Sequence, residues 1–155
     1  MNSFTRKTAL ASAVALAFGL SGLALADSHT DSFVVSATVV ASCHVDGTQN
    51  IDFPAFDAFT GDSGTGDLTI RCTNDSGYSI QLAYTGQMAA GAESLGYSLF
   101  QDAGHETAWD ADLNAKSATG NGDGQIHTVY ADVPADSTAK AGAYSETVNV
   151  TVVLD

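Results

Sequence analysis

The stretch DSFVVSATVVASC, residues 31–43, has the alternating pattern of a β-strand and lies near the start of the chain. In an extended conformation, side chains two positions apart share one face. That face is apolar here and carries Phe33, Val35, Ala37 and Val39. Val34 and Val40 interrupt the polar character of the opposite face. The pattern predicts a long apolar strand where the chain is free to move, so its pairing partner decides the fold.

Residues 1–26 have the parts of a secretory signal peptide. Arg6 and Lys7 form a basic start, an apolar run follows, and the sequence ALA at residues 24–26 is a small-x-small cleavage pattern. A membrane anchor is the alternative, but Ser and Gly residues interrupt the run and it is short for a span. We expect export and cleavage after residue 26, and no later stretch is apolar enough to span a membrane.

The chain is strongly acidic, with a formal net charge of −13 at pH 7. Removal of the leader leaves only Arg71, Lys116 and Lys140 against 18 acidic residues. Binding to nucleic acid or to anionic lipid depends on clusters of Lys and Arg. The composition therefore argues against nucleic acid as a partner, and solubility or salt tolerance is the simplest role for the acidity.

The two cysteines, Cys43 and Cys72, both follow the leader. An even number of cysteines in an exported chain predicts a disulfide, and closing a loop of this length should stabilise the fold by roughly 3–4 kcal/mol. Metal binding is the alternative, but neither cysteine has a CxxC partner and His44 stands alone beside Cys43. A redox role would also require such a motif. We predict a structural Cys43–Cys72 bridge.

After the leader, apolar alternation recurs in short segments separated by clusters rich in Gly, Asn, Asp and Ser. This pattern predicts one all-β domain, an antiparallel sandwich or barrel. The strands are expected at residues 67–73, 78–84, 96–101, 126–133 and 144–154. Turns are expected at residues 60–67 and 74–77, an exposed loop at 110–124, and residues 88–94 could form a helical turn.

The sequence contains no recognisable catalytic or metal-binding motif. The histidines fit no catalytic spacing, and no GxSxG elbow or comparable motif occurs, so we expect no enzyme and no cofactor. Residues 110–114 open like a calcium loop, but Ala115 replaces the glycine and Asn121 stands at the position of the bidentate Glu. We therefore expect a solvated acidic loop and no metal.

In order, the strand segments resemble those of the spore coat protein U family, which includes subunits of archaic (Csu-type) chaperone–usher pili. The resemblance runs from Phe33 to Leu154. Some family positions differ, because Pro54 stands where a glycine is usual, WDADLN replaces a glycine-containing turn, and the chain does not end on an aromatic residue. The segments that carry it are VSATVVASCHV (35–45), IDF (51–53), LTIRCT (68–73), YSLFQDAGHETAW (97–109), TVYADVPA (128–135) and GAYSETVNVTV (142–152).

The resemblance implies an incomplete immunoglobulin-like β-sandwich that is completed by donor-strand exchange. A periplasmic chaperone fills the gap first, and an outer-membrane usher then catalyses its replacement by the N-terminal segment of a sister subunit. The implied division is a signal peptide (1–26), a donor strand extension (27–40) and a pilin domain (41–155). The implied product is a homopolymer or mixed fibre at the cell surface, of the kind used in cell adhesion and biofilm formation.

The resemblance also implies which side chains act. The donor face is the alternating set Phe33, Val35, Ala37 and Val39, and burial of each larger side chain should contribute roughly 1.5–3 kcal/mol. The last strand should border the groove and meet the chaperone, through Tyr144, Val148, Val150 and Val152. An unfilled groove would expose apolar surface, so the free subunit should aggregate or require its chaperone.

Two alternatives belong to other classes of protein. In the first, the chain is a stand-alone secreted sandwich in which residues 31–43 form its own first strand. In the second, it is an adhesive or carbohydrate-binding domain whose surface uses Trp109 and tyrosines as platforms for sugar rings. The length left after the leader favours a shaft or adaptor subunit over a two-domain tip adhesin.

Overall fold

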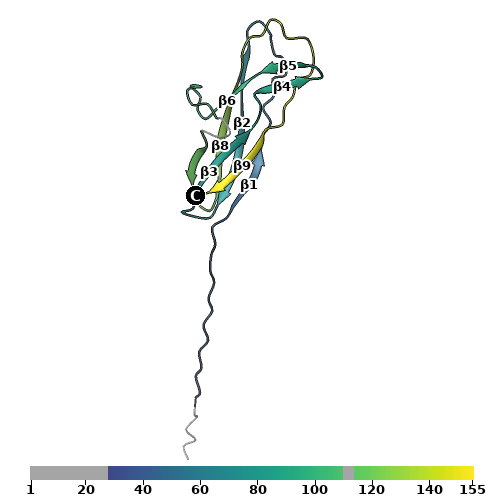
Figure 1. The fold of residues 1–155 in the computed structure, drawn as a ribbon. Coiled ribbons are helices and arrows are strands. Elements are labelled where there is room, and N and C mark those ends of the chain that lie inside the picture. The colour runs from purple at the N-terminus through teal and green to yellow at the C-terminus, as the bar shows by residue number, and fades with distance from the viewer. Residues whose placement is uncertain (1–27, 110–113) are drawn as a thin grey trace, which may run out of the picture. The chain divides into compact units, whose positions relative to one another are not determined.

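The computed structural model describes residues 28–109 and 114–155 (Figure 1). The expected signal peptide and the start of the calcium-like loop lie outside the described residues. The chain divides into two units, Met1–Ala37 and Thr38–Asp155. In the first unit, described residues 28–37 contain no helix or strand, and Phe33 and Val35 are 88% and 84% exposed. Residues 31–42 do not form the first strand of the sandwich, because a strand needs a backbone partner and the first paired strand begins at Cys43.

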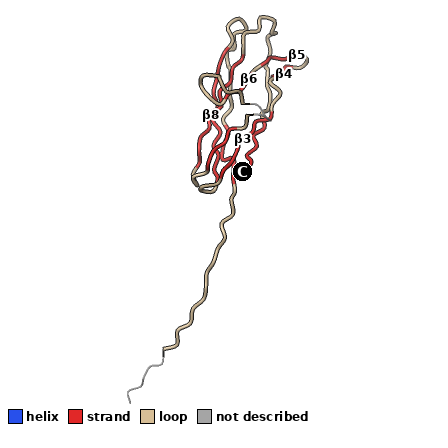
Figure 2. Tube along the Cα trace, turned by 60° about the vertical axis from the view of Figure 1, so that its left-hand side comes forward, coloured by secondary structure: helices blue, strands red, loops and turns tan. Residues whose placement is uncertain are grey.

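The second unit is built from β-strands, and its described residues contain no helix (Figure 2). One sheet has the order β1-β2-β8-β6, a second has the order β7-β3-β9, and β4 pairs with β5 as a hairpin. All strand pairs are antiparallel. The strands are β1 (Cys43–Thr48), β2 (Asp62–Cys72), β3 (Gly77–Ala83), β4 (Gln87–Ala90), β5 (Glu93–Gly96), β6 (Ser98–Phe100), β7 (Lys116–Thr119), β8 (Gly124–Val133) and β9 (Asn149–Leu154).

The core lies between the two larger sheets, where the alternating apolar side chains of facing strands meet. Strand β2 supplies Leu68 and Ile70, and β3 supplies Ile80 and Leu82; all four are buried. Trp109 is 0% exposed, and its indole Nε1 donates a hydrogen bond of 3.2 Å to the carbonyl of Ile80. This burial satisfies the one polar atom of the ring and makes Trp109 a core residue.

The core contains one buried polar pair in the described residues. The Nε2 atom of His127, on β8, lies 2.8 Å from the hydroxyl oxygen of Tyr78. Burial, and after it the charge of Lys116, lowers the pKa of His127 below its usual value, so the imidazole is neutral in the fold at neutral pH. The pair therefore acts as a neutral hydrogen bond within the sandwich.

The predicted disulfide is confirmed. Cys43 and Cys72 lie opposite each other in the β1–β2 pair, with Sγ atoms 2.01 Å apart. Immediately before the bridge, the Ser42 N–H donates to the Thr73 hydroxyl at 3.0 Å, and the Thr73 N–H donates to the Ser42 carbonyl at 2.9 Å. The chain is thus tied to the sandwich from Ser42 onward.

The turn predicted over residues 60–67 is wrong, because β2 already begins at Asp62. Gly64 and Gly66 face inward, and the side chains of Ile51 and Phe53 lie over them. A Cβ on Gly66 would come within 2.7 Å of the Gln49 carbonyl oxygen and of Ile51 Cγ1. The glycines therefore permit a close approach between strand and covering segment, which is a recognised use of glycine in strands.

Three other expectations on local structure need correction. Residues 88–94 form the β4–β5 hairpin rather than a helical turn, with Gly91 at a φ of +66° in its connection. Strand β7 lies inside the predicted loop of residues 110–124, because its residues pair with β3. The last strand is shorter than residues 144–154, because backbone pairing with β3 begins only at Asn149.

We predict that Gly66→Ala destabilises the sandwich, because the added methyl group must displace the backbone at Gln49 as well as Ile51. Overpacking of this kind costs about 1–3 kcal/mol. The matched control is Gly142→Ala, whose new Cβ would make an ordinary 3.6 Å contact with Ala90 Cβ. Urea unfolding of both variants checks this. Equal unfolding midpoints would contradict the close packing of residues 49–53 on β2.

The basic side chains of the described residues are all engaged within the fold. Arg71 Nε lies 2.7 Å from Asp46 Oδ2, and Lys140 Nζ lies 2.5 Å from Glu93 Oε1. Lys116 Nζ donates to the Gln101 carbonyl at 3.3 Å and lies 5.4 Å from the centre of a Trp109 ring. The remaining surface charge is therefore carried by carboxylates.

Candidate strand-binding groove

A groove of about 1380 Å³ opens into the core between the two larger sheets. Its floor is apolar and comes from both layers of the sandwich. Strand β8 contributes Val129, Ala131 and Val133, β2 contributes Leu68, and β3 contributes Leu82. These five side chains are at most 5% exposed, so in the described residues the groove reaches the core while its walls still cover the floor.

The groove lies between two strand edges that have no further strand beside them in the described residues. Strand β1 ends the four-stranded sheet, and β9 ends the three-stranded sheet. The two strands contact each other, and Figure 1 shows them side by side near the C-terminus. The groove itself is lined by residues that follow β1 and residues that precede and begin β9. It therefore opens where the two edges separate.

The first wall consists of residues 49–56, between β1 and β2. The Gln49 N–H donates a 2.8 Å hydrogen bond to the Asp67 carbonyl, so the wall continues the course of β1 along β2. Ile51 and Phe53 alternate inward and pack against the core. Their backbone is not paired as a strand, which leaves groups available to a partner.

The second wall consists of residues 139–148, between β8 and β9. It contacts the β4–β5 hairpin through two reciprocal backbone hydrogen bonds between Ala89 and Ser145, of 3.0 and 3.1 Å. The Tyr144 hydroxyl donates a 2.8 Å hydrogen bond to the Lys140 carbonyl within the same wall. This wall is therefore positioned by the hairpin, and not by the sheet that contains β9.

Three of the four residues expected to border the groove line it. Tyr144, Val148 and Val150 line it, whereas Val152 packs against the core beside it. Only Val150 and Val152 belong to β9, and Tyr144 and Val148 belong to the second wall. Phe33, Val35, Ala37 and Val39 are exposed, and none of them lines the groove.

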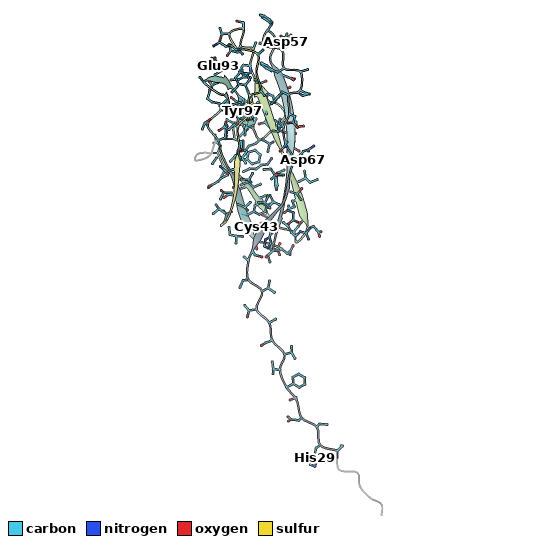
Figure 3. The ribbon with its side chains drawn as sticks, turned by 90° about the vertical axis from the view of Figure 1, so that its right-hand side faces the viewer. His29, Cys43, Asp57, Asp67, Glu93 and Tyr97 are labelled. Atoms are coloured by element: carbon cyan, nitrogen blue, oxygen red, sulfur yellow. A yellow bond between two sulfur atoms is a disulfide. The ribbon has the colours of Figure 1, made fainter. Side chains whose placement is uncertain are left out.

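Two groove residues were not predicted from the sequence. Glu146 accepts hydrogen bonds from the N–H groups of Thr85, at 2.5 Å, and Gln87, at 3.3 Å. Tyr97 presents a buried hydroxyl close to the Glu146 carboxylate, although the two do not meet in ideal hydrogen-bond geometry. Burial first, and then this carboxylate, raises the pKa of Tyr97 well above its usual value. Figure 3 shows Tyr97 in the half of the sandwich away from Cys43.

Within residues 28–109 and 114–155, no three His, Cys, Asp or Glu side chains gather as ligands for a metal ion. The same ranges contain no helix long and apolar enough to cross a membrane. In the part of the calcium-like loop that is described, Asn121 Oδ1 accepts the Asp123 N–H at 2.9 Å, which is ordinary turn geometry.

The fold and the groove define an all-β, immunoglobulin-like sandwich with one open side. The Spore Coat Protein U domain family matches residues 29–151, and the chain belongs to this family. The match includes residues of the N-terminal tail as well as the sandwich. The predicted family and the predicted fold class are thereby confirmed.

Among solved structures, the chain is similar to one in the crystal structure of the CsuC–CsuE chaperone–tip adhesion subunit pre-assembly complex from archaic chaperone–usher Csu pili of Acinetobacter baumannii. The TM-score is 0.53 at 24% sequence identity, and the similarity covers 74% of this chain and 40% of that chain. The present chain therefore spans less than half of the matched one, and the similarity is one of fold. No curated protein matches the chain significantly.

Proposed function

We propose that the protein is a structural subunit of a secreted chaperone–usher pilus or coat fibre. Each subunit inserts its N-terminal segment into the groove of its neighbour, and this insertion forms the polymer. The observation that carries the proposal is the groove with an apolar floor between residues 49–56, which follow β1, and residues 139–148, which precede and reach β9. A strand laid into it would bond to the edge backbones and cover the apolar floor.

The exposed N-terminal segment has the chemistry that such a groove requires. Residues 31–41 form no strand in the described structure, and their alternating face matches the period of a strand. Phe33, Val35 and Val39 are each at least 81% exposed, and large apolar side chains gain most from burial. Insertion of this segment into the groove of a second copy of the chain would therefore bury its apolar face and cover the apolar floor of the groove.

The proposal includes a route of assembly. The free groove exposes apolar surface, so a periplasmic chaperone would cover it until an outer-membrane usher exchanges it for a donor strand. The similar structure is a pre-assembly complex of a chaperone with a pilus tip adhesion subunit. The resulting fibre would lie at the cell surface, and the subunit would have no catalytic role.

Strand complementation tests this function. A mature chain that lacks residues 27–40 should aggregate when refolded alone, because its groove stays empty. The same chain should remain a soluble monomer in the presence of a synthetic peptide of residues 28–42. Size-exclusion chromatography measures both states. A stable, monodisperse monomer without the peptide would overturn the proposal.

The carbohydrate-binding alternative loses its main candidate residue. Trp109 is fully buried and donates its N–H to the backbone, so it offers no face to a sugar ring. No other described contact favours a sugar over a strand as the occupant of the groove.

A further inference from the structure

The second wall of the groove has few supports of its own. Residues 139–148 do not pair with β3, which holds only residues from Asn149 onward. Their contacts with the β4–β5 hairpin and the turn before it are the Ala89–Ser145 backbone pair, the Lys140–Glu93 ion pair and the hydrogen bonds to Glu146. The position of this wall sets the width of the groove, because Tyr144 and Val148 line it.

Glu146 makes the contact with the most specific chemistry. Its two carboxylate oxygens accept different backbone N–H groups, Oε1 from Thr85 and Oε2 from Gln87. These N–H groups flank Gly86, whose positive φ of 75° bends the connection between β3 and β4 toward the wall. The Gly86 carbonyl in turn accepts the Tyr97 N–H at 3.0 Å. One ionised side chain thus joins the wall to the turn before the hairpin.

The Lys140–Glu93 pair is a weaker support. The side chains of Lys140 and Glu93 are 70% and 42% exposed, and ion pairs at such sites contribute little. Glu146 and Glu93 are partly buried alike, but Glu146 accepts hydrogen bonds from backbone N–H groups, and hydrogen bonds to a charged acceptor are stronger than neutral ones.

We propose that Glu146 is the positioning residue of the groove: its carboxylate fastens the second wall to the β3–β4 turn and so holds the groove at the width that a donor strand needs. Release of this contact frees the wall and uncovers the Tyr97 hydroxyl at the groove. The consequence for donor binding rests on the proposed function, whereas the fastening itself concerns the single chain.

Acid should release the contact. Burial favours the neutral acid, but polar hydrogens outweigh burial and hold the pKa of Glu146 below its usual range. They belong, in order of effect, to the Thr85 N–H, the Tyr97 hydroxyl, the Thr85 hydroxyl and the Gln87 N–H. The fastening is therefore complete above the ordinary glutamic acid pKa of about 4.3 and is lost as the pH falls through the lower folded value. The other titratable groups near the wall are Tyr144 within it, Tyr97, Tyr84 beside Tyr97, and the Lys140–Glu93 pair.

The decisive experiment is amide hydrogen exchange on the full mature chain, with Glu146→Gln and the control Glu93→Gln. A glutamine has one acceptor oxygen, and its NH₂ group faces the second N–H without accepting it. The Thr85, Gln87, Ala89 and Ser145 amides should lose protection by about tenfold or more in Glu146→Gln at pH 7. Glu93→Gln should change them by much less. Unchanged protection in Glu146→Gln would overturn the proposal.

A pH series separates fastening from general stability. In the wild type, protection of these amides should fall as Glu146 becomes protonated in acid, before the circular dichroism signal changes, whereas Glu146→Gln should show no such step. If Glu146→Gln does not fold, the wild-type series alone decides, and loss of protection only together with global unfolding would refute the proposal. Dissociation of the residue 28–42 peptide should also be faster in the variant. Failure of the wild type to bind this peptide would refute the proposed function and leave the fastening intact.

Discussion

Val35→Asp should abolish polymer assembly. In a donor strand, Val35 would lie at the centre of the inward face, with Phe33 and Ala37 on either side. An unpaired carboxylate is costly to bury, and the apolar floor of the groove offers it no partner. The subunit should still fold on its chaperone, because its own described core does not include Val35. The measurement is the ladder of fibres on gels without boiling, alongside recovery of the chaperone–subunit complex.

Ser36→Asp is the matched control, because position 36 lies on the opposite face of an extended segment and the added charge remains in water. It should assemble almost as well as the wild type, whereas Ala37→Asp should behave like Val35→Asp. Assembly by Val35→Asp at the level of Ser36→Asp would contradict insertion of this face. Loss of the chaperone complex in Val35→Asp would mean that the segment belongs to its own domain.

Removal of the disulfide should give the largest loss of stability in the folded unit. The bridge joins residues 29 positions apart, and a loop of that length contributes roughly 3–4 kcal/mol on the chain-entropy estimate. Cys43→Ala with Cys72→Ala is the suitable pair of changes, because Cys72 is 1% exposed and a serine would bury a hydroxyl there. Urea unfolding of the mature chain measures the difference.

Ser42→Ala serves as the control for this pair, because it removes only an exposed hydroxyl that lies 3.4 Å from the Thr73 hydroxyl. Its midpoint should differ little from that of the wild type. If the double alanine variant unfolds at the same urea concentration as Ser42→Ala, the bridge contributes no stability and its structural role is refuted.

Local alternation was sufficient to predict the strands whose pattern is complete within themselves. Residues 78–84 and 126–133 predicted β3 and β8 closely, because every second side chain in them faces the core. The disulfide followed from the cysteine count alone. By contrast, the glycine-rich start of β2 predicts a turn by its composition. It forms a strand because Ile51 and Phe53, from the preceding segment, cover Gly64 and Gly66.

The sequence did not predict which segments form the walls of the groove. Tyr144 and Val148 were expected in an edge strand, yet they lie in the second wall, which is hydrogen-bonded to the β4–β5 hairpin. Nothing near Glu146 in the sequence indicates its partners, because Thr85 and Gln87 become neighbours only when the β3–β4 turn folds. Alternation reports which face of a strand is buried, but it cannot report which side chain bridges two connections.

The engagement of Arg71, Lys116 and Lys140 inside the fold has a colloidal consequence. In a filament of such subunits, carboxylates would greatly outnumber basic groups along the surface, and the three basic side chains of the described residues each have a partner within their own subunit. Side-by-side filaments would then repel one another over the Debye length, about 8 Å at physiological ionic strength and about 30 Å at 0.01 M. Dilute buffer should keep the filaments apart, and added salt should let them bundle.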